Sequence, residues 1–229
     1  MVQLKDGNVR FPTGPEKVLS KDNPPPELGY WVQRLREHDP MQRTHAAMVL
    51  GLMGAQAQPA VPALILALKD RDPQVRRMLV AALGEIGPGS RAAVPALVSA
   101  LRDPSEVVRR WAAMSLGEMG TEARGAIPAL VTALQDVSEQ VRRWAAAALG
   151  EMGPRAAEAI PALIQMFREP APATRAIAAA CLRRIGPACV NPLLNALEDR
   201  DPQVRRHAAL ALAKCGGDLA TRSSALRRA

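Results

Sequence analysis

One glycine recurs along the chain at a fixed interval, and this interval restricts the fold more than any other feature. Its copies lie 33 residues apart from Gly54 to Gly186, and Gly216 follows after 30. A second glycine series, which starts at Gly51, and an arginine series keep the same spacing. Self-similarity at such a period is typical of a solenoid, in which each repeat buries its apolar face only against its neighbours.

The first half of each repeat predicts a helix that ends at this glycine. In the repeat at 68–101, Asp72 can cap the first N–H groups, and Pro73 is tolerated in the first turn. Apolar residues then recur at helical spacing as far as Ile86. We expect Gly87 to end the helix with a positive φ, which glycine adopts without steric cost. The same is expected of Gly120 and Gly153.

The second half predicts a companion helix. It should begin at Ser90 or Arg91 and reach Leu101, with Pro95 in its first turn, because an interior proline removes a hydrogen bond. Helices of the first kind are predicted at 42–50, 75–83, 108–116, 141–149, 174–182 and 204–212. No segment alternates with period two, so we expect no strands and an all-α fold.

Three motifs within the repeat belong to a known pattern. They are DPQVRR at 72–77, AALGEIG at 81–87 and AVPAL at 93–97. The pattern resembles the HEAT repeat, and within it the short HEAT-like repeat of the phycobilisome-lyase type, over residues 27–216. The resemblance implies a right-handed α-solenoid of about six two-helix repeats. Residues 1–26 are then an extended arm or linker, and residues 217–229 a C-terminal cap or a frayed tail.

The resemblance also implies roles for the two helices of each repeat. The helices with the Val-Arg motif would line the inner, concave wall, and those with the Pro-Ala-Leu motif the outer wall. One arginine series would be structural and would bridge to turn aspartates such as Asp70, Asp103, Asp136 and Asp199. Its members are Arg76, Arg109, Arg142 and Arg205.

The sequence contains no set of residues that predicts catalysis, a metal or a cofactor. It lacks His-x-x-x-His, Cys-x-x-Cys, Gly-x-Ser-x-Gly and phosphate-loop motifs. The three cysteines, Cys181, Cys189 and Cys215, form no close pair, which fits a reducing cytoplasm. No apolar run approaches the ~18 residues of a membrane span. We therefore expect a non-enzymatic, cytoplasmic protein.

The inner helices predict one continuous surface. A helical projection at about 100° per residue places an apolar track of Met78, Trp111, Trp144 and Ile177 on the inner wall, with Met114 beside it. Four arginines flank this track: Arg77, Arg110, Arg143 and Arg206. Arg110 and Arg143 should be more exposed than the structural series. Glu85, Glu118 and Glu151 lie a turn away. The tryptophans suit either partner binding or packing between repeats.

Three functions fit these features. The first is an interaction scaffold that binds a protein or peptide segment with apolar anchors and acidic groups, since solenoids present long concave surfaces and the net charge is +8. The second is nucleic-acid binding along the arginines, although glutamates interrupt them. The third, which only the resemblance implies, is phycobilin-lyase-like handling of a chromophore.

Overall fold

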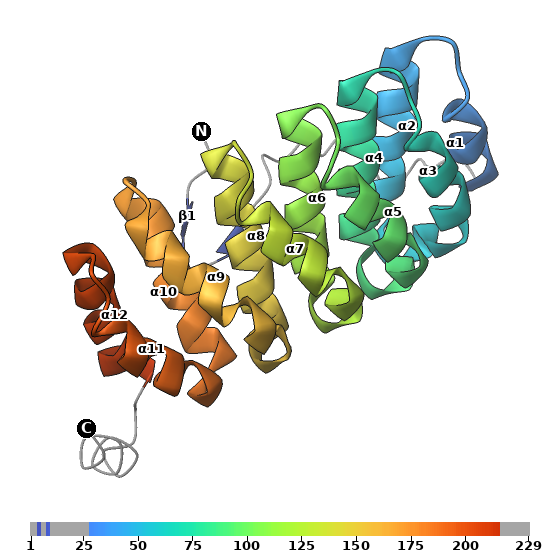
Figure 1. Ribbon diagram of the computed structural model, residues 1–229. Helices are drawn as coiled ribbons and strands as arrows, with labels where there is room; N and C mark the ends of the chain where they lie inside the picture. Colours follow the sequence, from blue (N-terminus) through green and yellow to red (C-terminus); the bar gives the residue numbers. More distant parts are fainter. Residues whose placement is uncertain (1–3, 6–7, 10–27, 216–229) are drawn as a thin grey trace.

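The computed structural model describes residues 4–5, 8–9 and 28–215, and this part of the chain is almost entirely helical. Twelve α-helices, α1 to α12, follow one another in pairs along an elongated molecule (Figure 1). The predicted α-solenoid of about six two-helix repeats is confirmed. The expected arm at 1–26 and the expected segment at 217–229 lie almost wholly outside the described residues.

The helices form two layers. The inner layer consists of α2 (Pro40–Leu52), α4 (Pro73–Ile86), α6 (Glu106–Glu118), α8 (Glu139–Met152), α10 (Pro172–Ile185) and α12 (Pro202–Cys215). The outer layer consists of α1 (Leu28–Arg34), α3 (Val61–Ala67), α5 (Val94–Ala100), α7 (Ile127–Ala133), α9 (Ile160–Gln165) and α11 (Val190–Ala196). Successive inner helices pack directly on one another, whereas each outer helix packs mainly against an inner helix and the neighbouring 3-10 helices. Closer spacing in the inner layer makes that side the concave one.

The ends of the inner helices follow from their terminal residues. Asp72 accepts a hydrogen bond from the backbone N–H of Gln74 at 2.7 Å, and Pro73 opens α4. Positive φ values of 70°, 55° and 59° at Gly87, Gly120 and Gly153 confirm the prediction for these residues. At Gly87 and Gly153 ψ is −141° and −135°, outside the left-handed helical region, so the chain turns sharply where a Cβ atom would be strained.

The companion segments begin differently from the prediction. Residues Gly87–Ala93 form a 3-10 helix, η2, and α5 starts only at Val94, although Pro95 does lie in its first turn. Ser90 is buried instead of opening a helix, and its hydroxyl lies 2.6 Å from the carbonyl oxygen of Leu83. The other 3-10 helices are η1 (Gly54–Ala60), η3 (Gly120–Ala126), η4 (Gly153–Ala159), η5 (Met166–Arg168) and η6 (Pro187–Cys189).

The core is a row of leucines between the two layers. Fully buried leucines of the inner helices are Leu50, Leu83, Leu116, Leu149 and Leu182. Those of the outer helices are Leu64, Leu97, Leu130, Leu163 and Leu193. Each repeat therefore buries its apolar surface against the next one rather than in a shared central core.

The second glycine series permits close contact between inner helices. Its described members are Gly51, Gly84, Gly117 and Gly150, and all four are buried. A Cβ atom at Gly84 would lie 2.8 Å from the Cβ atom of Ser115, and one at Gly117 would lie 3.1 Å from the Cα atom of Ala148. These helices can approach so closely only because no side chain stands between them.

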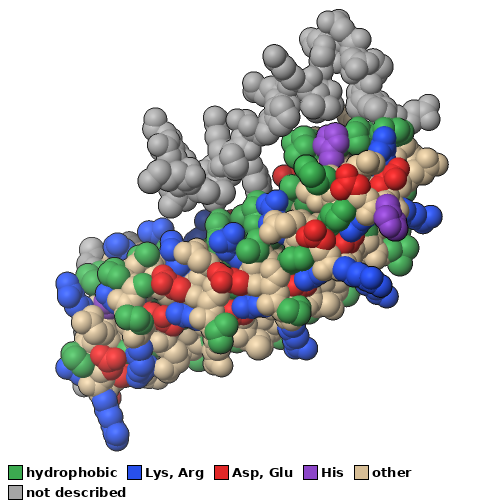
Figure 2. Space-filling model, turned by 90° about the horizontal axis from the view of Figure 1, so that it is seen from above, with side chains coloured by type: hydrophobic (Ala, Val, Ile, Leu, Met, Phe, Trp, Pro, Cys, Tyr) green, Lys and Arg blue, Asp and Glu red, His purple; other side chains and the backbone are tan. Residues whose placement is uncertain are grey.

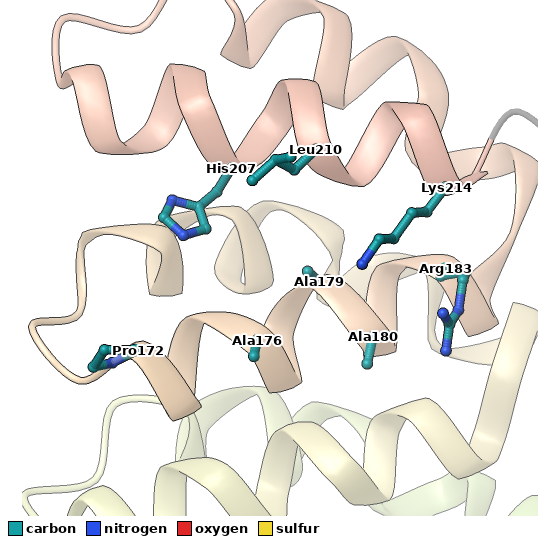
Figure 3. Close-up of a pocket in the computed structure, with 8 residues that line it drawn as sticks. All are labelled: Pro172, Ala176, Ala179, Ala180, Arg183, His207, Leu210 and Lys214. Carbon is teal, nitrogen blue, oxygen red and sulfur yellow. The ribbon is translucent and has the colours of Figure 1, made fainter.

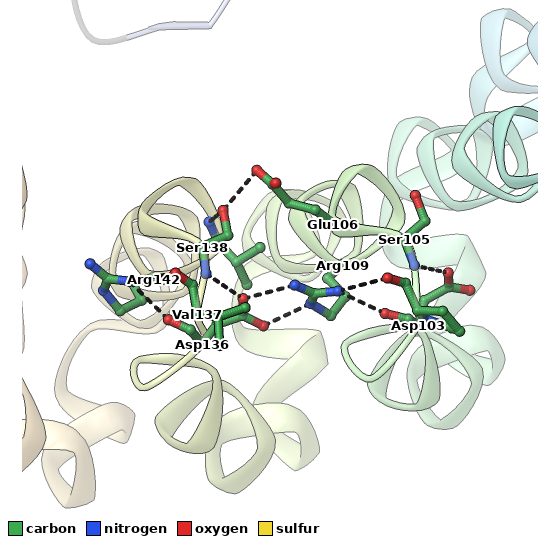
Figure 4. A network of polar contacts seen from close by, with 10 residues as sticks. Asp103, Ser105, Glu106, Arg109, Asp136, Val137, Ser138 and Arg142 are labelled. Atoms are coloured by element: carbon green, nitrogen blue, oxygen red, sulfur yellow. Dashed lines mark hydrogen bonds and ion pairs between the residues drawn. The ribbon is translucent and has the colours of Figure 1, made fainter.

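A ladder of ion pairs joins the turns along one edge (Figure 4). The Arg109 guanidinium donates to the carbonyl oxygens of Asp103 and Pro104 in its own turn, at 2.9 and 3.2 Å. It also donates to both carboxylate oxygens of Asp136 in the next turn, at 2.7 and 2.9 Å. Burial opposes ionisation of Asp136, but hydrogen bonds from Arg109 and from the Ser138 N–H outweigh it and lower the pKa of Asp136.

Other arginines bridge successive turns in the same way, although Arg142 reaches its carboxylate through a single hydrogen bond. Equivalent pairs are Arg43–Asp70, Arg76–Asp103 and Arg142–Glu169. Arg205 donates to the carbonyl oxygens of Asp199 and Arg200. The prediction that these arginines reach turn aspartates or turn carbonyls is confirmed, with Glu169 in the place of one aspartate.

Two short strands precede the solenoid. Leu4–Lys5 (β1) pairs antiparallel with Asn8–Val9 (β2), and Leu4 lies opposite Val9. No strand was expected in this segment. The signal was the Asp-Gly pair at 6–7, a frequent hairpin sequence, between strands too short to show alternation.

Candidate protein-binding surface

The predicted apolar track lies along the inner layer. Met78, Trp111, Trp144 and Ile177 come from four successive inner helices, and each is partly exposed and packed against the core. His207 on α12 continues the row, and its ring centroid lies 5.6 Å from that of Phe167. The track therefore contributes to packing between repeats and also presents surface, so binding through it remains a prediction.

Trp111 is in contact with an arginine of the flanking row. The guanidinium carbon of Arg77 lies 5.5 Å from the Trp111 ring centroid, within the range of a cation–π interaction. Desolvation by burial and then the nearby charge of Arg110 lower the pKa of Arg77. The inner wall thus holds cations against an apolar track, where an incoming carboxylate would relieve their mutual repulsion.

The expected difference in exposure between the two arginine series is absent. Arg110 and Arg143 are half-buried, and so are the structural arginines Arg76, Arg109 and Arg142. On this concave wall a flanking arginine can lie against the next inner helix, as Arg77 does against Trp111 at 5.5 Å. Arg206 is exposed and lies on α12, the last helix of the described residues. The structural arginines differ from the flanking arginines only in their hydrogen bonds to the turns.

Met114 was expected beside the track as a displayed residue, and this expectation is wrong. Its side chain is only 8% exposed on α6. The close approach of α4, α6 and α8 covers it, whereas Leu210, at the same repeat position on α12, is 50% exposed. Met114 fills space between inner helices.

A row of glutamates follows the same wall. Desolvation raises the pKa of Glu85, and desolvation together with the charge of Glu85 raises that of Glu118 to about 7. Glu118 is nevertheless an exposed residue of the inner wall, and its carboxylate lies over Gly84 of the preceding inner helix. In the next repeat Glu151 pairs with Arg184.

Charges of both signs are mixed on the face of the molecule seen in Figure 2. In the view of Figure 2, basic and acidic side chains are interspersed along the length of the molecule and do not form one continuous patch. This distribution does not resemble the basic stripe that nucleic-acid binding favours.

The described residues contain no geometry for metal or thiol chemistry. Among them no three His, Cys, Asp or Glu side chains lie together as a metal site would require. Cys181 and Cys189 are buried, and burial raises the pKa of Cys181 to about 12. A thiol with so high a pKa is a poor nucleophile at neutral pH.

The fold and this inner wall define the class of protein. A model of HEAT repeats matches residues 30–116, 61–150, 94–180 and 160–228, which together span most of the chain. The protein therefore belongs to the HEAT-repeat family. No curated protein sequence matches the chain. Within the described part of the chain, no helix combines the length and apolar character needed to cross a bilayer.

Solved structures share the solenoid. The complex of CpcE and CpcF of phycocyanin lyase from Nostoc sp. PCC7120 is 28% identical, with a TM-score of 0.63, and the match covers 86% of this chain and 79% of that one. An engineered protein is 23% identical, with a TM-score of 0.61 and coverage of 83% and 96%. YibA of Escherichia coli is 24% identical, with a TM-score of 0.53 and coverage of 85% and 70%.

Proposed function

We propose that this protein is a non-catalytic scaffold that binds a segment of a partner protein along its inner wall. The observation that carries the proposal is the track of four partly exposed apolar side chains with arginines beside it. Tryptophan and arginine are the residues that most often anchor protein interfaces. A partner segment with apolar anchors and acidic groups would match both rows, and we place this activity in the cytoplasm.

The spacing of the tryptophans supports an extended ligand. Trp111 and Trp144 lie one repeat apart, about 10 Å by the packing distance of helices. Two rings stack on each other only when their centroids are ~4.5–7 Å apart. Two separate anchors on a bound helix or strand fit this spacing better than one flat ligand held between the rings.

The test is a pull-down from the source cell with the wild type and the Trp111→Ala/Trp144→Ala double variant. We expect a specific partner to be lost, with affinity for the purified partner reduced by ~2 kcal/mol or more per anchor. Leu66→Ala is the matched control, because Leu66 is 66% exposed on the outer helix α3. Unchanged partner binding with a large loss of thermal stability would mean that the tryptophans serve only packing.

A second candidate is chromophore handling, and the similarity to the phycocyanin lyase complex supports it. Fold similarity alone is weak support for a shared activity. Adding a bilin to the purified protein and recording its absorbance spectrum tests this candidate, which predicts a saturable shift. Nucleic-acid binding would show instead as an affinity that falls steeply with salt.

A further inference from the structure

The last two inner helices are separated by a groove. A hollow of about 260 Å³ lies between α10 and α12, with Ala176, Ala179 and Ala180 on one side and Leu210 on the other (Figure 3). α12 also packs less extensively on α10 than the preceding inner helices pack on each other. The groove therefore interrupts the close-packed inner wall near its C-terminal end.

The interruption coincides with a break in the second glycine series. Counting 33 residues on from Gly150 leads to Arg183, so an arginine stands where four preceding repeats have glycine. Glycine at this position lets the next inner helix approach closely, as Gly117 does for Ala148. The Arg183 side chain prevents such a close approach. Arginine in place of the repeated glycine is therefore the sequence feature that indicates the groove.

The groove combines an apolar floor with a basic end. Leu210 is 50% exposed above the alanines. Arg183 and Lys214 lie at the same end of the groove, and Lys214 extends from α12 toward α10 (Figure 3). Lys214 and Arg184 occupy the row in which earlier repeats carry Glu85, Glu118 and Glu151. None of the described residues that line the groove is acidic.

We propose that this groove binds an acidic segment of the partner protein, which places an apolar side chain against Leu210 and a carboxylate near Lys214 and Arg183. The inference rests on the proposed function of the inner wall and fixes where the acidic part of the partner lies. The hollow is smaller than the ~300–1,000 Å³ of most small-molecule sites, so it suits one or two side chains. The chain's own residues 217–229 carry three arginines and one aspartate, so their charge does not complement the basic end.

The test uses the full chain and a fluorescein-labelled 15-residue peptide with two leucines four positions apart, flanked by glutamates. Anisotropy titrations should show saturable binding that weakens about tenfold with Lys214→Glu and about tenfold with Leu210→Ser. Lys69→Glu makes the same charge change in a turn remote from the groove and should alter the affinity less than about twofold. A peptide with lysines in place of the glutamates should bind Lys214→Glu better than it binds the wild type.

Other outcomes would overturn the proposal. No saturable binding by the wild type would do so, as would an affinity of the Lys214→Glu and Leu210→Ser variants equal to that of the wild type. If only the Trp111→Ala/Trp144→Ala variant loses the peptide, the proposed function stands and the groove is not the acidic site. Self-association that Leu210→Ser abolishes would identify a second copy as the occupant. Binding that appears only after Leu219→Ser and Leu226→Ser would identify the chain's own C-terminal residues.

Discussion

Glycine has two different roles in this chain. Gly153 has a φ of 59° and only one neighbouring atom near an added Cβ, the carbonyl oxygen of Arg184 at 3.7 Å. Gly84 lies within a helix, where an added Cβ would clash with Ser115. The first role depends on backbone conformation and the second on the distance between helices. Both recur every 33 residues, so spacing alone does not separate them.

Gly153→Ala should lower the stability of the fold by about 1–3 kcal/mol, because alanine is strained at this φ and ψ. For a chain of this length each kcal/mol corresponds to about 2–4 °C in the melting temperature. Gly125→Ala is the control, since Gly125 is exposed, lacks a positive φ and has no atom near an added Cβ. Equal melting temperatures for both variants in a calorimetric scan would contradict the conformational explanation.

Glu118→Gln should stabilise the protein above pH 7. The pKa of Glu118 is raised from 4.5 to about 7 in the folded protein, so the folded state binds the proton of this carboxyl group more tightly than the unfolded state does. The contribution of this proton binding to the stability of the fold is fully present below pH 4.5 and is lost as the pH rises through about 7. Glutamine does not ionise and avoids this loss, which solvent screening limits to about 1 kcal/mol or less.

Melting temperatures between pH 4.5 and pH 8 measure this effect. The difference between the Glu118→Gln variant and the wild type should grow as the pH rises. Glu158→Gln replaces an exposed glutamate of η4 and serves as the control. A difference that is constant with pH, or largest at pH 4.5, would show that Glu118 is not held in its protonated form by the wall.

At the scale of elements, the turns carry the most specific interactions. Arg76, Arg109 and Arg142 each join the carbonyl oxygens of their own turn to a carboxylate of the next, so one side chain fixes two successive repeats. The pair formed by Arg109 and Asp136 is only 12% and 11% exposed. Planar, bidentate pairing of this kind favours arginine over lysine.

Arg109→Ala should destabilise the protein by about 2–3 kcal/mol, because it leaves the Asp136 carboxylate partly buried without its partner. Arg110→Ala, one residue further along the same helix, is the matched control and should cost less than half as much. Chemical unfolding of the two variants measures the difference. Equal losses of unfolding free energy in the two variants would contradict the distinction between structural and flanking arginines.

The sequence was sufficient to predict the elements but not the details of the surface. Caps, glycine turns and leucine spacing are local features, so α4 and its equivalents could be predicted closely. Exposure of Met114 and Arg110 depends on how near α8 comes to α6, which a single-helix projection does not contain. The start of α5 was also missed: Gly87–Ala93 form a 3-10 helix, as do the equivalent segments η1, η3 and η4, which have alanine at the position of Ser90.

At the scale of the whole molecule, stability should follow nearest-neighbour contacts and need not be equal at the two ends. At the N-terminal end α2 packs closely on α4, and Arg43 pairs with Asp70 at 2.6 Å. At the C-terminal end the turn before α11 is three residues shorter. Arg175 therefore meets His207 at 3.3 Å, and Asp199 pairs with Arg168 instead.

Hydrogen exchange should consequently be faster in α12 than in α2, with α4, α6 and α8 the slowest of the inner helices. His207→Glu would give Arg175 a carboxylate partner and should slow exchange in α12 by about twofold to fivefold, the effect of a partly exposed ion pair. His45→Glu, at the same repeat position on α2, is the control and should leave α12 unchanged. Mass spectrometry of peptides from each helix measures both effects. Faster exchange in α2 than in α12 would contradict this explanation. Neither the Arg175–His207 contact, which replaces an arginine–carboxylate pair, nor the groove beside α10 would then decide which end opens first.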